Sequence, residues 1–173
     1  MWPFILTLIS AVLFFGFVAF CWVKFGLQSC YSAYGPLWAK TPPFSYSFNP
    51  WSLVTMLVAL ILIPAIIESA EGSAWQFTAF LCPACIAFVA LTPDYVEGGT
   101  TLKVHLICAA TAALWGVLYI IFCATSVWWL IPTYLVLAGG AILYFGKWSW
   151  NYWLEMAAFL MVYTAMIVMT WPK

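Results

Sequence analysis

Six apolar runs, separated by short polar connections, account for most of the chain. They cover about residues 2–23, 51–67, 74–91, 102–123, 127–145 and 150–170. A helix that crosses the hydrocarbon core of a membrane needs ~20 mostly apolar residues. The pattern therefore predicts an all-α integral membrane protein, a bundle of six transmembrane helices in a single transmembrane domain over residues 1–173.

The connections between these runs differ in length and character. Residues 25–50 form the longest connection, which is rich in Pro, Tyr, Ser and Phe. It is too aromatic for a solvated linker, so we expect an aromatic loop that caps the bundle, with a short interfacial helix at residues 27–34. Six crossings place both chain ends on one face, side A. The aromatic loop, the loop at residues 93–101 and the turn at Lys147 then lie on the opposite face, side B.

Composition supports a membrane protein and excludes one class of partner. Hydrophobic residues make up 67% of the chain and charged residues 6%, with a mean hydropathy of +1.07. Soluble domains carry about 25% charged residues. The five basic residues are all lysines and are balanced by five acids. A nucleic-acid partner is excluded because phosphate binding needs a basic surface.

Small residues mark two helix faces. One stripe has helical spacing in the fourth run: His105, Ala109, Ala112, Gly116 and Tyr119. Small side chains let neighbouring helices approach closely, so we expect His105 to face the protein interior. The loop before it carries Asp94, Glu97 and Lys103. A second small segment, residues 138–141, predicts a packing face within the chain or between copies in a homo-oligomer.

Four short segments resemble a known family. They are SCYSAYGPLW, AFLCPACIAFVALTPDY, KVHLICAATAALWG and NYWLEMAAF. Together they are similar to the six-helix bacterial membrane proteins of unknown function related to the DRAM, Sfk and PGAP-type family. The resemblance implies that the family's polar positions are Ser32, Tyr34, Pro93, His105 and Glu155. It also implies a multi-pass protein of the bacterial inner membrane; eukaryotic members are associated with lipid handling, autophagy and glycolipid-anchor remodelling.

Membrane orientation stays open at this point. Four lysines lie on side B and only Lys173 on side A, so the positive-inside rule places side B in the cytoplasm. The family resemblance implies the opposite, since its first loop is taken to face away from the cytosol.

Polar residues on side B form the first candidate site. Glu155 lies about one turn inside the last helix, where an unpaired charge is costly, and His105 or Lys103 could pair with it. One interpretation is a pocket for a lipid or a lipid-like ligand; the other is a structural clamp between His105 and Glu155. We predict that the ligand-binding residues are Ser32, Tyr34, Trp38, Asp94, His105 and Glu155, with membrane lipids as partners. No catalytic residue can be named, and an enzyme is the less favoured class.

Cysteines supply the main alternative. Cys82 and Cys85 form a CxxC motif, which in a membrane bundle is typical of a thiol-disulfide oxidoreductase, with Cys30 as a possible electron shuttle. A thiolate is hard to form in apolar surroundings, so simple packing is the competing interpretation. One histidine makes a poor ligand set for zinc or iron, and we predict neither a metal nor a cofactor. A structural or assembly subunit is the third hypothesis.

Overall fold

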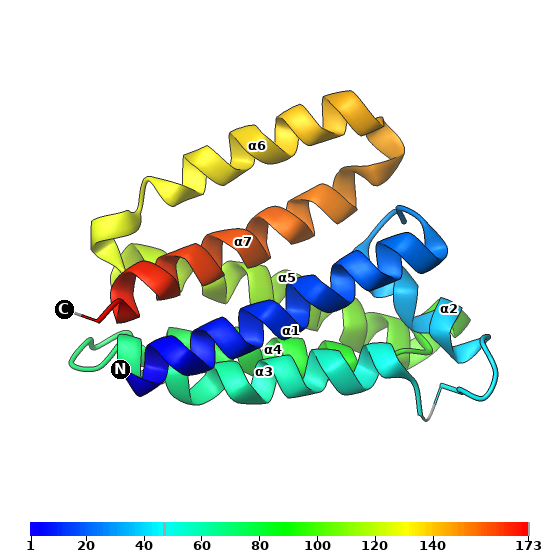
Figure 1. The fold of residues 1–173 in the computed structure, drawn as a ribbon, viewed down its shortest axis with the longest axis horizontal. Coiled ribbons are helices and arrows are strands. Elements are labelled where there is room, and N and C mark those ends of the chain that lie inside the picture. Colours follow the sequence, from blue (N-terminus) through cyan, green and yellow to red (C-terminus); the bar gives the residue numbers. More distant parts are fainter. Residues whose placement is uncertain (47, 173) are drawn as a thin grey trace.

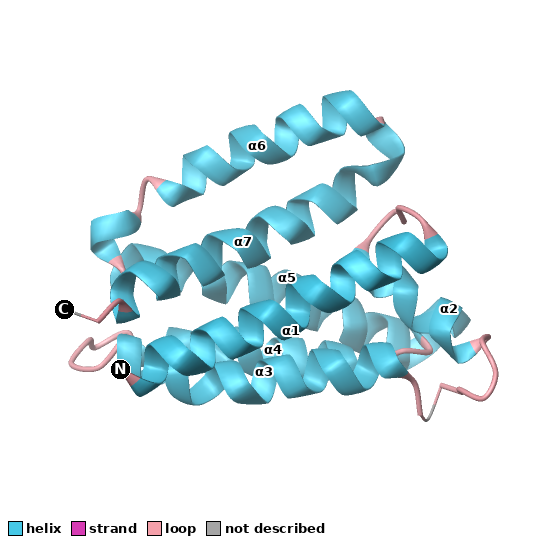
Figure 2. Ribbon diagram, in the orientation of Figure 1, coloured by secondary structure: helices cyan, strands magenta, loops and turns pink. Residues whose placement is uncertain are grey.

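The computed structural model describes residues 1–46 and 48–172, with the side chain of Glu97 excepted. Lys173, which entered the lysine count, and the Glu97 side chain, a predicted member of the loop cluster, lie outside the described part. The described residues form helices, turns and loops without any strand (Figure 2). An all-α chain is therefore confirmed.

Four helices are long and apolar enough to cross a membrane by length and composition. They are α1 (Trp2–Phe25), α3 (Pro50–Ser69), α5 (Gly99–Phe122) and α7 (Trp150–Thr170), the last extended by the 3-10 turn η4 (Lys147–Ser149). Two further apolar helices are shorter: α4 (Gln76–Ala90) has 15 residues and α6 (Leu130–Phe145) has 16. The structure confirms four candidate spans and does not confirm six.

The two short helices begin later than the sequence predicts. Before α4, the hydroxyl of Ser73 accepts the backbone N–H of Trp75, which holds these residues in a turn. Before α6, the 3-10 helix η3 (Thr125–Val127) takes up the start of the predicted run. Both helices therefore lose part of the length that the apolar pattern assigns to them.

The helices run up and down in a bundle (Figure 1). Helix α4 packs between α3 and α5, α1 packs on α3, and α7 contacts α1, α5 and α6. Both chain ends lie at the same end of the bundle, side A, and the long first loop lies at the other.

Helix α6 is outermost and packs mainly on α7, with only Leu130 and Ala138 buried. A Cβ at Gly139 or Gly140 would meet no atom within 4 Å, so these positions are open, and a homo-oligomer stays a prediction.

The first loop packs into the bundle as well as covering it. Its helical part is η1 (Tyr31–Ala33) and α2 (Tyr34–Ala39), later than the predicted residues 27–34. The shift arises because Gly26, at φ +73°, ends α1 and Gln28 donates to the carbonyl of Phe25. Tyr31 is buried, and its ring lies 5.2 to 6.0 Å from rings on α1, α3 and α7.

The small stripe of α5 faces the interior, as predicted. His105, Ala112, Gly116 and Tyr119 are all buried. A Cβ at Gly116 would lie 2.9 Å from Cγ2 of Val162 on α7. Glycine at position 116 therefore allows α5 and α7 to make contact at this level of the bundle. Between this contact and side B, the two helices leave a space between them.

Candidate functional site

A cavity lies inside the bundle between η1, α3, α4, α5 and α7. The space open to the centres of water molecules is about 90 Å³, enough for several waters. Most of the wall is apolar, from aliphatic side chains of α3, α4 and α7, the ring of Phe159 and four alanines. The polar residues in the wall are Tyr31, Ser32, Thr55, His105, Glu155 and Tyr163.

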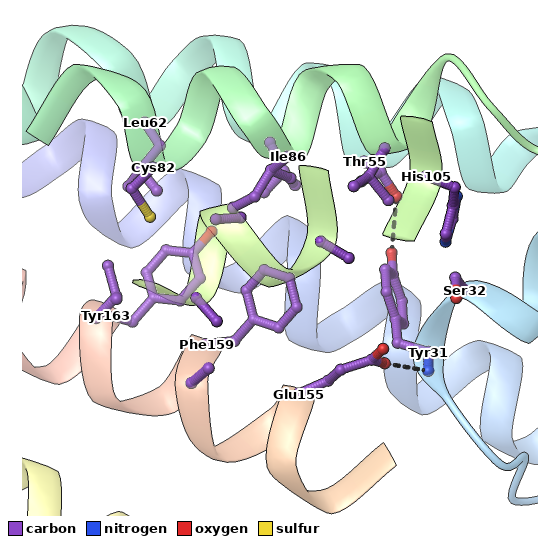
Figure 3. A pocket seen from close by; sticks show the side chains of 17 residues that line it. Tyr31, Ser32, Thr55, Leu62, Cys82, Ile86, His105, Glu155, Phe159 and Tyr163 are labelled. Carbon is purple, nitrogen blue, oxygen red and sulfur yellow. Dashed lines mark hydrogen bonds between the residues drawn. The ribbon is translucent and has the colours of Figure 1, made fainter. Parts of the chain in front are cut away.

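Polar groups collect at one end of this cavity. Figure 3 shows Tyr31, Ser32, Thr55, His105 and Glu155 together near η1 and the first loop, which is the side B end. The opposite end holds Leu62, Cys82 and Tyr163. The cavity is therefore amphipathic along the length of the bundle.

Tyr31 ties the polar end together. Its backbone N–H donates to Oε2 of Glu155 at 2.6 Å, a charge-assisted bond when the carboxyl is ionised. Its hydroxyl bonds to Oγ1 of Thr55 at 2.9 Å. Burial raises the pKa of Tyr31 far above its ordinary value, partly offset by the bond to Thr55. The phenol therefore stays neutral, and one residue of η1 connects α7 to α3.

His105 is fixed by Thr92, the second residue after the end of α4. Its Nδ1 lies 3.0 Å from Oγ1 and 3.2 Å from the carbonyl oxygen of Thr92. The Thr92 hydroxyl donates its own proton to the carbonyl of Val89, so both neighbours of Nδ1 act as acceptors. This network assigns the proton to Nδ1 and leaves Nε2 as an acceptor. Nε2 has no hydrogen-bond partner among the described residues, and His105 is only 2% exposed.

Aromatic rings hold the imidazole from its faces. Tyr95, in the 3-10 turn η2 (Tyr95–Glu97), stacks on His105 with ring centroids 4.1 Å apart and planes 20° apart. Trp51 lies 6.5 Å away at 28°. Burial raises the pKa of Tyr95, so its hydroxyl remains protonated. Stacking and the bonds to Thr92 together orient the ring in the cavity wall.

The wall between α5 and α7 is built from small side chains. Ala109 and Ala113 of α5 and Ala158 of α7 line the cavity. Ala113 is also exposed, and the other two are half-buried. The cavity therefore reaches the bundle surface between these two helices, where lipid would lie in a membrane.

The structure brings together half of the predicted ligand-binding residues. Ser32, His105 and Glu155 line the cavity, whereas Tyr34, Trp38 and Asp94 do not. Tyr34 is fully buried and donates to the carbonyl of Gly26 at 3.0 Å. Trp38 donates to Sγ of Cys21 at 3.3 Å, with Nζ of Lys24 3.8 Å above its ring. Asp94 is half-buried at the start of η2.

The predicted clamp between His105 and Glu155 is replaced by two separate contacts. Glu155 accepts from Tyr31, and His105 bonds to Thr92. Lys103, the other predicted partner of Glu155, is exposed and does not line the cavity. Glu155 therefore connects α7 to the first loop, and His105 connects α5 to the loop after α4. Neither of the two side chains neutralises the other.

Sequence reasoning missed Thr55, Tyr95 and Tyr163. The Tyr163 hydroxyl lies 2.7 Å from Oγ of Ser10 on α1. Since Ser10 gives its own proton to the carbonyl of Val58, Tyr163 is the donor in this pair. A polar side chain in the middle of an apolar run must find a partner, and that signal was available for both Thr55 and Tyr163.

The CxxC motif lies within α4, away from either helix end. Cys82 is 3% exposed and lines the cavity, and both its thiol and that of Cys85 are free. Cys85 accepts a hydrogen bond from Thr111 at 3.4 Å. Among the described residues, no three His, Cys, Asp or Glu side chains lie together in a way that could hold a metal ion.

Comparisons of this chain with protein-family models, with curated proteins and with solved structures find no match. The resemblance to the six-helix family therefore stays a prediction.

Proposed function

We propose that this protein is an integral membrane protein that binds a lipid or lipid-like ligand in the cavity between α3, α4, α5 and α7. The observation that carries the proposal is the amphipathic cavity itself. It combines a polar end around Glu155 and His105 with apolar walls and an alanine-lined opening. Ligand sites have this combination of apolar lining and a few placed polar groups.

Cavity size indicates how such a ligand lies. A space of about 90 Å³ for water centres accommodates a small head group but not a long chain as well. The head group would occupy the polar end beside Glu155, and the chain would pass between Ala113 and Ala158 into the surrounding lipid. Small side chains on both helices keep that route open.

We also propose that α4 and α6 cross the membrane, which gives six spans. Helix α3 ends at side A and α5 begins at side B (Figure 1), so α4 must travel the length of the bundle between them. The same holds for α6, which connects the end of α5 to the start of α7. Helices of 15 and 16 residues extend about 23 Å at ~1.5 Å per residue, and the turns beside them supply the remainder of a ~30 Å core.

Native mass spectrometry tests the binding proposal. Protein released gently from its membrane should carry a lipid-sized adduct, which His105→Ala should lose and Lys103→Ala should keep, because Lys103 is exposed on the same helix. If His105→Ala fails to fold, Ala113→Phe provides a second variant that obstructs the opening from an exposed position. A bare wild-type polypeptide, or an adduct that both cavity variants retain, would contradict the proposal.

One observation favours a second candidate, a thiol-disulfide oxidoreductase. Cys82 lines the same cavity and stands one helical turn from Cys85. An intact mass lower by two hydrogens, lost on disulfide formation, would support it. If both thiols remain reduced and resist alkylation under an oxidant and a quinone, this candidate fails.

A further inference from the structure

The polar end of the cavity presents hydrogen-bond acceptors. Oε2 of Glu155 accepts from Tyr31, and the second carboxyl oxygen has no partner among the described residues. Nε2 of His105 is an acceptor because Nδ1 holds the proton against Thr92. With Glu155 ionised, these two groups both require a donor, whereas the Tyr31 and Thr55 hydroxyls share one hydrogen bond and keep one proton between them.

Positive charge is missing from the cavity wall. No lysine is among its lining residues, and the chain contains no arginine. The four lysines in the described part, Lys24, Lys40, Lys103 and Lys147, are all exposed. A carboxylate surrounded by low dielectric is costly without a partner, and the protein supplies Glu155 only with a backbone N–H.

We propose, resting on the function proposed above, that the ligand supplies the missing donor. The cavity binds a single-chain amphiphile whose head group donates hydrogen bonds, a long-chain amine or alcohol. It rejects chains that end in a carboxylate or a phosphate. An anionic head would meet the Glu155 carboxyl without a compensating cation, and a carboxylate head would also offer no proton to Nε2 of His105.

The proposal also ranks the two accepted head groups. An ammonium group carries three N–H donors and a charge that complements Glu155, whereas a hydroxyl carries one donor and no charge. Charge-assisted bonds exceed neutral ones in strength. The amine should therefore bind more tightly than the alcohol, by about tenfold to hundredfold.

Four probes that share one alkyl chain test this order: hexadecylamine, hexadecanol, hexadecanoate and hexadecyl phosphate. Each is titrated against delipidated protein in a non-ionic detergent, and occupancy is measured by native mass spectrometry. We expect the amine to bind most tightly, then the alcohol, with both anions at least about tenfold weaker than the alcohol. This order is read on the unmodified protein, so it does not depend on the folding of any variant.

Glu155→Gln then identifies the group responsible. It should remove the advantage of the amine and leave the alcohol within about threefold of its wild-type affinity. Glu68→Gln makes the same change at an exposed acid near the other end of the bundle and should leave the order unchanged. If Glu68→Gln has the same effect as Glu155→Gln, the preference for the amine reflects unspecific attraction to negative charge, and the proposal is overturned.

The remaining outcomes separate the two proposals. If an anionic probe binds as tightly as the amine, the head-group inference is overturned while ligand binding stands. If none of the four probes binds and no adduct is retained, the proposed function itself fails.

Discussion

Replacing Gly116 by alanine should force α5 away from α7. The added Cβ would lie 2.9 Å from Cγ2 of Val162 and 3.5 Å from Sγ of Cys82. Carbon atoms normally approach to about 3.5–4.0 Å, so the overlap with Val162 is about 0.6–1.1 Å. Valine cannot easily rotate away, because its two methyl groups restrict χ1 in a helix.

The magnitude follows from two opposing terms. Overpacking a filled interior costs about 1–3 kcal/mol. Replacing glycine by alanine inside a helix gains up to ~1 kcal/mol. Gly140→Ala on α6 isolates the second term, because a Cβ there meets no atom within 4 Å. The difference between the two variants is therefore the overpacking term alone, about 1–3 kcal/mol less stability for Gly116→Ala.

Thermal unfolding in a mild detergent measures this difference. For a chain of this length, 1 kcal/mol corresponds to about 2–4 °C in Tm. The Tm of Gly116→Ala should thus lie about 2–12 °C below that of Gly140→Ala. An equal or higher Tm for Gly116→Ala would refute the close contact between α5 and α7. It would also refute the helix packing that forms this wall of the cavity.

Two further predictions concern single hydrogen bonds. Tyr163→Phe removes the 2.7 Å bond to Ser10 and should lower the free energy of unfolding by about 1 kcal/mol. The control Tyr144→Phe, at a residue 84% exposed, should leave the free energy of unfolding unchanged. Equal stability of the two variants in denaturant titrations would contradict the bond. Thr92→Val removes one of the two acceptors of His105, so retention of the proposed ligand in native mass spectrometry should fall about fivefold with the circular dichroism spectrum unchanged. Undiminished retention would mean that the carbonyl of Thr92 alone orients the ring.

The helices could be predicted from the sequence because their apolar runs are long and bounded. The run predicted at residues 74–91 matches α4 (Gln76–Ala90) to within two residues at each end. Which face of each helix turns inward was harder to predict, since helices that are apolar all round carry little amphipathic signal. Only for α5 did the sequence predict the inward face, from the stripe of small residues through His105 and Gly116. Pairs such as Ser10 and Tyr163 depend on which helices are neighbours, and a single sequence does not encode that directly.

Residues of the candidate site were predictable to different degrees. Glu155 stood out as a charge inside an apolar run, where function or a partner is required. Trp38 was expected at the ligand, but an aromatic residue in a loop can equally fill the interior, and here its ring packs with α1 and Lys24. Thr92 lies just beyond the run predicted at residues 74–91, and the sequence indicated no role for it. Its role in fixing the histidine tautomer requires the three-dimensional hydrogen-bond network.

The bond between Tyr31 and Glu155 joins positions 124 residues apart. During synthesis the N–H of Tyr31 is made with the first loop, and its acceptor is made only with α7. Contacts this distant in sequence form late, because a long loop must close first. In a nascent chain that stops before α7, the first loop already lies beside α1 and α3, but the N–H of Tyr31 still lacks its acceptor. Formation of α7 closes the polar end of the cavity, so this end is complete only after every helix that lines it has been made.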